Sequence, residues 1–285
     1  MTITRANFQA IIDRVATVPS LPEVVTQVCQ LVNDPESNAR DIEAIVIKDP
    51  AMAAKMLRMV NSVYYGLPQP VQSLGQAVPI LGFKTIRSIA LSISVINLFQ
   101  QHTASFSMKA FWMHSSVCAC LCRLVAEKAS ACDPELGFVI GLLKGIGKIL
   151  LVENAPNEVR AIIAVAKEYN YSFRRATREV IDTDDCEIAG WLMEKWNLGP
   201  EIADTIRWQA DLAKAADKRL AAMCQFADYT CALKKVRISG DCDEPVLDPA
   251  VWAHLGMDKT ALMQVLTVIN DEVDNARQLL QLARG

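Results

Sequence analysis

The sequence predicts an all-α protein made of many packed helices. Hydrophobic residues make up 52% of the 285 residues and aromatic residues only 6%, a mixture that favours packed helices over sheets. Apolar residues recur every three or four positions along most of the chain, and no window shows the sustained alternation of a β-strand. Pro and Gly divide these windows into segments of helical length. The chain is long enough for one large helical domain or two packed subdomains.

The composition also argues against some classes of function. A net charge of −3 and a pI near 5.7 give no global reason to bind nucleic acid or an anionic membrane. The N-terminus has no apolar signal-peptide core, and the longest strongly apolar run, Ile89 to Phe99, is too short to cross a bilayer. Nine cysteines without an export signal are expected to be reduced thiols. We therefore expect a soluble, cytoplasmic protein with no membrane association.

Five short helices are expected in the first hundred residues. Ser20 and Glu23 have the spacing of a capping box, and Asn38 with Asp41 three residues later indicates a second helix start. Asp49, followed by proline, ends that helix and opens the third. The five expected helices are 21–33, the segment begun by Asn38, 51–61, 77–81 and 85–99.

Four motifs in this region carry a family resemblance. They are V-P-S-L-P at 18–22, I-V-I-K-D-P-A at 45–51, L-R-x-V-N-S-x-Y-Y-G at 57–66 and V-x-S-L-x-Q-A-V-x-x-L-G at 71–82. In this order they resemble the HDOD family, the HD-related output modules of bacterial signalling proteins, over about residues 15 to 215. The resemblance implies an N-terminal helical subdomain at 1–104, an HD-like helical subdomain at 105–216 and a C-terminal helical extension at 217–285.

A helix from about 108 to 129 carries His114 and a group of cysteines. His114 resembles the first metal-ligand histidine of the HD superfamily, although a buried histidine that is hydrogen-bonded to a neighbour is the commoner role. Of Cys118, Cys120 and Cys122, only the first and last share a helix face. Two thiols make no zinc site without partners from elsewhere, so we interpret them as core residues.

The stretch Gly137 to Val152 is expected to form one buried helix, introduced by Asp133-Pro134-Glu135. Its sequence resembles the G-L-L-H-D-I-G-K-L segment of HD metal-dependent phosphohydrolases, in which the adjacent His and Asp bind the catalytic metal. Lys144 and Gly145 occupy those two positions here. A lysine ammonium has no free lone pair and glycine has no side chain, so neither binds a divalent cation.

The other ligand regions of the HD resemblance are altered as well. Asp185-Cys186 occupies the place of an Asp-His pair, and Trp208-Gln209 replaces a pair of histidines. The chain holds only three histidines, too few for a histidine-and-carboxylate metal centre, so we expect no metal and no cofactor. The vestigial HD-site positions, as we call them, are His114, Lys144, Gly145, Asp185, Cys186, Trp208 and Gln209.

Several cations are candidate contacts for an anion or a partner: Lys144, Lys148, Arg174 and Arg175. Lys144 and Trp208 either fill the former metal pocket or line an anion-binding replacement. The arginines lie just ahead of Asp182, Asp184 and Asp185, so a self-compensated surface is the simpler interpretation.

The C-terminal extension is expected to contain helices at 218–234 and 249–255 and a long final helix capped by Asp258. Its apolar residues recur with the spacing of a coiled-coil seam: Leu262, Leu266, Ile269, Val273, Ala276 and Leu280. The seam either joins two copies of the chain in a homodimer or packs the helix onto its own domain, and its short length favours packing.

The resemblance therefore implies a non-catalytic bacterial signalling module that binds a partner protein or a small ligand, and not an enzyme. Kinase, receiver or cyclase proteins are the expected partners. The alternative is a divergent metal-dependent phosphohydrolase that uses Asp182, Asp184, Asp185 or Cys186 as unusual ligands. Helices between residues 38 and 61 superficially resemble a helix-turn-helix with cations at Lys48, Lys55 and Arg58, but their methionines look like core residues, which disfavours nucleic-acid binding.

Overall fold

The structure is a computed structural model, and it describes residues 13, 20–32, 34–99, 106–181, 183–238, 241–242 and 246–284. Within these ranges all regular elements are helices, which confirms the predicted all-α class. None of the described helices is both long and apolar enough to cross a membrane. Val18, Pro19, Asn33 and Asp182, which the sequence-based predictions include, lie outside the described residues.

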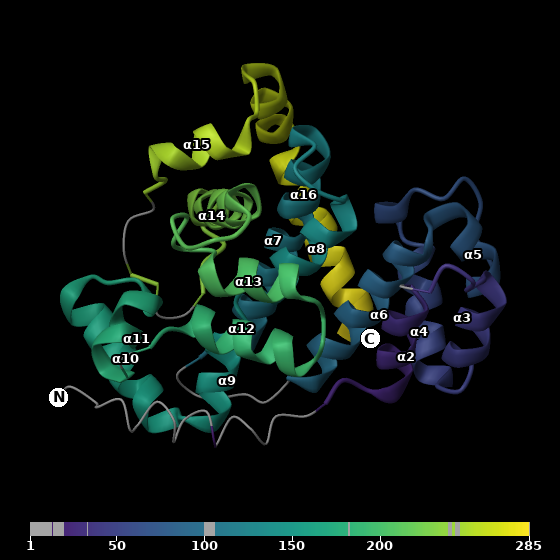
Figure 1. The fold of residues 1–285 in the computed structure, drawn as a ribbon, viewed down its shortest axis with the longest axis horizontal. Helices are drawn as coiled ribbons and strands as arrows, with labels where there is room; N and C mark the ends of the chain where they lie inside the picture. Colours follow the sequence, from purple (N-terminus) through teal and green to yellow (C-terminus); the bar gives the residue numbers. More distant parts are fainter. Residues whose placement is uncertain are drawn as a thin grey trace. The chain divides into compact units, whose positions relative to one another are not determined.

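The described chain divides into two compact units (Figure 1). The described residues between 101 and 272 form one unit, and those between 20 and 100 together with 273–284 form the other. The domain boundary expected after residue 104 lies outside the described residues, and the boundary expected after residue 216 stays a prediction.

The smaller unit contains the short helices of the N-terminal region: α2 (Glu23–Leu31), α3 (Ala39–Val46), α4 (Pro50–Val60), η1 (Val63–Tyr65), α5 (Leu74–Leu81) and α6 (Phe83–Leu98). The capping box at Asn38 and Asp41 is confirmed, and Asp49 caps α4. The capping box predicted at Ser20 is wrong, because α2 begins one residue after Pro22 and has no side-chain cap.

The helix-turn-helix interpretation finds no support in this unit. Met52, Met56 and Met59 of α4 are buried, as core residues are. The Lys55 ammonium donates to the main-chain carbonyls of Ala283 and Arg284, each at 3.3 Å. Lys55 thus caps the C-terminal end of the last helix, where a cation interacts favourably with the helix dipole.

The larger unit holds α7 (Met108–Ala129), α8 (Pro134–Leu143), α9 (Ile146–Asn154), α10 (Pro156–Tyr169), α11 (Phe173–Ile181), α12 (Asp185–Lys195), α13 (Pro200–Trp208), α14 (Lys218–Leu233), α15 (Pro249–Leu255) and the first part of α16 (Lys259–Arg284). Figure 1 shows α7 beside α8 and α14, its main packing partners. Two glycines allow α8 to approach α7 closely. A Cβ added at Gly141 would lie 2.5 Å from the carbonyl oxygen of Cys118, and one at Gly137 would lie 2.8 Å from that of Cys122.

The single helix predicted over Gly137 to Val152 is wrong, because the structure forms two helices with a break at Lys144 and Gly145. The start is as expected, since Asp133 accepts from the main-chain N–H of Glu135 at 2.9 Å. At the break, Gly145 leaves the helical conformation with φ −95° and ψ 0°. The two residues at the HD position therefore lie at a corner of the backbone.

The last helix, α16, begins as predicted, because Asp258 accepts from the main-chain N–H of Ala261 at 2.7 Å. The predicted seam is partly wrong. Ile269, Ala276 and Leu280 are buried, but Leu266 is 45% exposed and Val265 is buried in its place. The side chain of Leu262 lies outside the described set. The buried stripe follows the 3.6-residue period of a packed helix, which drifts away from a strict heptad.

Candidate functional site

A cavity of about 240 Å³ lies in the larger unit, between the α8–α9 corner, α7 and α14. Six of the seven vestigial HD-site positions line it: His114, Lys144, Gly145, Asp185, Cys186 and Gln209. Trp208 is not among the lining residues, and the ammonium of Lys214 lies over its ring, 4.8 Å from the centroid. Residues that are as much as 95 positions apart in the sequence are thus brought to one place.

Lys144 forms the central contact of this cavity. Its ammonium donates to Asp228 Oδ1 on α14 at 2.5 Å and to Gln209 Oε1 at 3.3 Å. The Lys144 side chain is 6% exposed, whereas that of Asp228 is 47% exposed. Burial opposes the charge of Lys144, but the Asp228 carboxylate outweighs burial and holds the pKa of Lys144 well above its usual value. Lys144 is therefore a buried, permanently charged cation.

The Asp228 carboxylate is the anion to which two cavity groups converge. Burial would raise its pKa, but the Lys144 ammonium lowers the pKa of Asp228 to about 2. His114 Nε2 lies 3.5 Å from the same oxygen that accepts from Lys144. The expectation that His114 is a buried histidine with a neighbouring polar partner agrees with this geometry, since it is 8% exposed.

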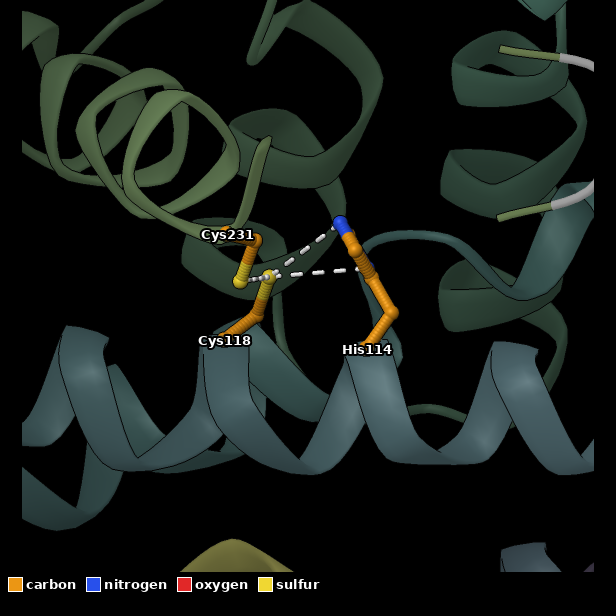
Figure 2. A group of neighbouring side chains, drawn as sticks. All are labelled: His114, Cys118 and Cys231. Carbon is orange, nitrogen blue, oxygen red and sulfur yellow. Dashed lines mark hydrogen bonds between the residues drawn. The ribbon is translucent and has the colours of Figure 1, made fainter. Parts of the chain in front are cut away.

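Cys118, one turn beyond His114 on α7, lies next to this group. Its Sγ is 3.6 Å from His114 Nδ1 and 3.6 Å from Cys231 Sγ of α14. Figure 2 shows the three side chains pointing toward one another. Burial opposes ionisation of this thiol, but hydrogen bonding from Cys231 and the neighbouring His114 and Lys144 lower the pKa of Cys118 to about 5. The surroundings of Cys118 thus favour its thiolate form.

Gln209 lines the cavity and is held by hydrogen bonds to the main chain. Its amide nitrogen donates to the main-chain carbonyls of Lys144 and Ile206, each at 2.9 Å, and its own main-chain carbonyl accepts from Gln225 Nε2 at 2.9 Å. The side-chain amide of Gln209 therefore donates to one main-chain carbonyl at the α8–α9 corner and to one in α13. Its remaining oxygen already accepts from Lys144.

A second buried ion pair lies at the other side of the cavity. The Lys148 ammonium donates to Asp241 Oδ2 at 3.0 Å, and Asp241 Oδ1 also accepts from the main-chain N–H of Phe173 at 3.0 Å. Burial opposes both charges, but each partner stabilises the other, so the pKa of Lys148 is raised and that of Asp241 is lowered. The Lys148 ammonium also lies over the Phe173 ring.

The start of α12 brings Asp185 and Cys186 to the cavity. Asp185 is buried, its Oδ1 has no hydrogen-bond partner among the described residues, and burial raises its pKa. Burial also raises the pKa of the Cys186 thiol to about 12. Arg174 lies near this thiol, with Nη1 3.8 Å from Sγ, and lines the cavity.

The other arginines of this region face away from the cavity. Arg178 pairs with Asp184, which agrees with the expected self-compensation. Arg175 is exposed and its guanidinium stacks on the Tyr171 ring, 3.7 Å from the centroid. Of the four candidate cations, the cavity is thus lined by Lys144, Lys148 and Arg174 and not by Arg175.

This residue set does not fit the hard divalent metal that the HD resemblance implies. Such a metal needs several carboxylate or imidazole ligands held together. Among the vestigial HD-site positions that line the cavity, His114 supplies an imidazole and Asp185 a carboxylate, and the Lys144 ammonium already donates to the Asp228 carboxylate. A second cation at that carboxylate would meet a fixed positive charge.

Sequence reasoning missed three groups that complete the site: Asp228, Cys231 and Asp241. Asp228 and Cys231 lie in an otherwise apolar helical window, Phe226 to Cys231, where a carboxylate is a signal of a buried ionic partner. Asp241 follows the end of α14 in a segment without periodicity, and its sequence carries no comparable signal.

Comparison with known proteins identifies related chains. The model of the HDOD domain matches residues 18–212. An HDOD domain protein of unknown function from Geobacter sulfurreducens has a TM-score of 0.80 at 22% identity, over 95% of this chain and 99% of that one. A protein from Shewanella amazonensis SB2B, provisionally named a phosphohydrolase, has a TM-score of 0.75 at 24% identity, over 95% and 98%. One from Marinobacter aquaeolei VT8, provisionally named a signal transduction protein, has 0.77 at 18%, over 98% and 66%.

Two curated bacterial relatives are longer than this chain. An uncharacterised protein from Treponema pallidum is 22% identical over 227 residues, which is 78% of this chain and 43% of the relative. The uncharacterised protein YuxH from Bacillus subtilis is 26% identical over 116 residues, which is 40% of this chain and 28% of the relative. The chain thus spans less than half the length of each of these relatives.

Proposed function

Because the chain belongs to the HDOD family, we propose that it is a non-catalytic signal-transduction module that binds a partner protein or a small ligand through a degenerate HD-type scaffold. A protein of similar fold bears a signalling name, and another bears a phosphohydrolase name. Because fold similarity alone does not assign an activity, the proposal rests on the side chains of the cavity.

One observation carries the proposal: Lys144 stands at the sequence position where the HD motif has a metal-binding histidine, and its ammonium is paired with a carboxylate. Lys144 donates to Asp228 at 2.5 Å and is buried, so its charge is an integral part of the site. In a metal phosphohydrolase the ion polarises the phosphate or lowers the pKa of bound water. A metal ion here would have to displace the Lys144 ammonium, and an ammonium does not perform either function as a metal ion does. The geometry therefore favours recognition over hydrolysis.

The test of this proposal is hydrolysis of phosphate esters and cyclic dinucleotides by the purified full chain with Mn²⁺, Fe²⁺, Ni²⁺ or Mg²⁺. We expect no turnover above the metal-only background. His114→Ala and Asp228→Asn serve as matched variants, since His114 Nε2 lies 3.5 Å from Asp228 Oδ1 and each variant removes one partner of this contact. Turnover by the wild-type chain that disappears in both variants would show that it is an enzyme and would refute the proposal.

For a small ligand, we propose an anion that carries a phosphate group. The cavity is lined by four cations, Lys144, Lys148, Arg174 and Arg237, against three carboxylates. Two of these carboxylates are engaged by the lysines, and the raised pKa of the third, Asp185, reduces its negative charge. Arg174 adds a guanidinium whose planar donors suit phosphate oxygens.

Calorimetric titration with pyrophosphate and with nucleotides tests this extension. Arg174→Gln should weaken binding by roughly tenfold, because it removes a charge-assisted contact. Arg175→Gln is the matched control, since Arg175 is its sequence neighbour but does not line the cavity. Equal losses in both variants would indicate a surface effect of charge and not a cavity ligand.

The divergent phosphohydrolase remains the second candidate because of one cluster. Ligand atoms of Asp184, Asp185 and Cys186 lie within 4.8 Å of one another. However, Asp184 is engaged by Arg178 and by the main-chain N–H groups of α12, and the high pKa of Cys186 disfavours a thiolate. Metal-dependent turnover that is lost in Asp185→Asn but retained in His114→Ala would identify this cluster as the centre.

A further inference from the structure

A second possible ligand set lies beside the cavity and consists of soft donors. His114 and Cys118 project from successive turns of α7, and Cys231 projects toward them from α14 (Figure 2). The imidazole and the two sulfur atoms lie within 4.8 Å of one another, and all three residues are buried. Cys231 is the partner from a distant helix that the α7 cysteines lack in the sequence alone.

The two distances from Cys118 Sγ to the other donor atoms are close to the edges of a zinc tetrahedron, and the third pair lies within 4.8 Å. Zinc–sulfur bonds of about 2.3 Å and zinc–nitrogen bonds of about 2.0–2.1 Å give sulfur–sulfur edges of about 3.8 Å and sulfur–nitrogen edges of about 3.6 Å. The distance from Cys118 Sγ to Cys231 Sγ is 3.6 Å, and that from Cys118 Sγ to His114 Nδ1 is also 3.6 Å.

Asp228 completes the arrangement from outside the ligand set. Its Oδ1 lies 3.5 Å from His114 Nε2 and 3.8 Å from Cys118 Sγ. A carboxylate that accepts from the second ring nitrogen orients a metal-bound histidine and makes it a better ligand. His114 would thus bind through Nδ1 while Asp228 holds the Nε2 proton.

The charge of the buried group favours a divalent, thiophilic ion. Two thiolates balance a charge of +2, and Asp228 balances Lys144, so the group as a whole is neutral. A monovalent ion would leave one negative charge buried, which is costly. Thiolate and imidazole ligands select zinc over the hard ions magnesium and manganese.

We propose that His114, Cys118 and Cys231 form a zinc site between α7 and α14, with Asp228 supporting His114. The fourth position is open to a non-protein ligand. This inference goes beyond the proposed function, because it concerns a soft-metal site that requires no hydrolysis. Bound zinc would join α7 and α14 at one wall of the ligand cavity, because His114 and Asp228 belong to the proposed zinc site and also line the cavity.

The experiment uses the reduced full chain, freed of metal by a chelator. Zinc is titrated against a chromophoric chelator, and Co²⁺ is added as a spectroscopic probe whose sulfur-to-cobalt charge-transfer band reports thiolate ligands. We expect one zinc per chain and a charge-transfer band. Cys118→Ser, Cys231→Ala and His114→Ala should each weaken zinc binding on the order of 100-fold or more.

Two cysteine variants are matched controls. Cys120→Ser changes a buried thiol on the same helix, and Cys186→Ser changes the thiol of the Asp184, Asp185 and Cys186 cluster. Both should bind zinc as the wild-type chain does. Stoichiometric zinc binding that survives Cys231→Ala, or a Co²⁺ complex without a charge-transfer band, would overturn the proposal.

A second measurement tests the proposal on the wild-type chain, in case a variant does not fold. In the wild-type chain under mild denaturant, zinc should protect Cys118 and Cys231 from alkylation, as mapped by mass spectrometry, while the other seven cysteines keep their rates. Protection that falls on other cysteines overturns the zinc site. The hydrolysis assay on the same samples separates the two proposals, because turnover that depends on Cys231 would refute the non-catalytic function and uphold the zinc site.

Discussion

The Lys144–Asp228 ion pair permits a quantitative test of the site. Lys144 is 6% exposed and Asp228 47% exposed, so removal of either partner leaves a different penalty behind. Breaking a fully buried pair costs about 3–5 kcal/mol, whereas exposed pairs contribute about 0–1 kcal/mol. Lys144→Met leaves a carboxylate that can turn to water, and we expect it to lower the free energy of unfolding by about 1–2 kcal/mol. Asp228→Asn leaves a buried ammonium and should cost about 3 kcal/mol.

The double variant isolates the interaction energy. Replacing both partners removes the unpaired charge, so we expect a coupling energy of about 2 kcal/mol between Lys144→Met and Asp228→Asn. Urea unfolding of the four proteins, with a metal chelator present, measures it. The exposed pair Arg277–Asp274 is the matched control and should show a coupling below about 0.5 kcal/mol.

Two outcomes would refute the reasoning about this pair. A coupling energy as small as that of the exposed control would show that the ammonium is not held against the carboxylate. A larger loss for Lys144→Met than for Asp228→Asn would show that the buried charge is on Asp228 and not on Lys144. Either result would also remove the main support for the non-catalytic proposal.

Two further predictions follow from packing and from titration. Gly147→Ala places a Cβ 1.9 Å from the main-chain oxygen of Asp185, so we expect a loss of about 3 kcal/mol in urea unfolding. Gly145→Ala meets only the Phe111 ring, at 3.3 Å, and should cost clearly less; equal losses would contradict the packing of α9 on α12. Burial raises the pKa of Glu153 to about 7, so the folded state holds this proton more tightly than the unfolded state does. Its stability contribution is therefore present below about pH 4.5 and is lost as pH rises through 7. Glu153→Gln should gain about 1–2 kcal/mol over the wild-type chain between pH 5 and pH 8, allowing for the partial exposure of the carboxyl, and a difference in melting temperature that stays constant across this range would contradict the shift.

The helices were predictable because the signals that form them are local. Asp133, Asp217 and Asp258 each accept from main-chain N–H groups within the next three residues, and the apolar period of the following segment is readable in the sequence. The helices expected at 108–129, 218–234 and 249–255 therefore agree with α7, α14 and α15 to within about one residue. The break at Gly145 is not predicted, because a glycine in an apolar helical window does not by itself indicate a turn.

The vestigial HD-site positions were also found from sequence, because side-chain chemistry needs no coordinates. A lysine and a glycine lack the lone pairs that a metal requires wherever they lie in the fold. That six of these seven positions line one cavity agrees with the motif resemblance, while their roles stay a prediction. Trp208 is the exception among the vestigial HD-site positions. The motif includes it, but in the structure its ring contacts the ammonium of Lys214.

Most helices, their buried faces and the side chains that cannot bind a metal are readable from the residues alone. Which groups meet depends on how the helices pack: Lys144 pairs with Asp228 across 84 positions, and Cys118 contacts Cys231 across 113. Helical periodicity tells which face of a helix is buried but not which helix it packs against. Helix packing brought α14 against α7 and the α8–α9 corner, and so placed a carboxylate on the lysine and a second thiol beside the first.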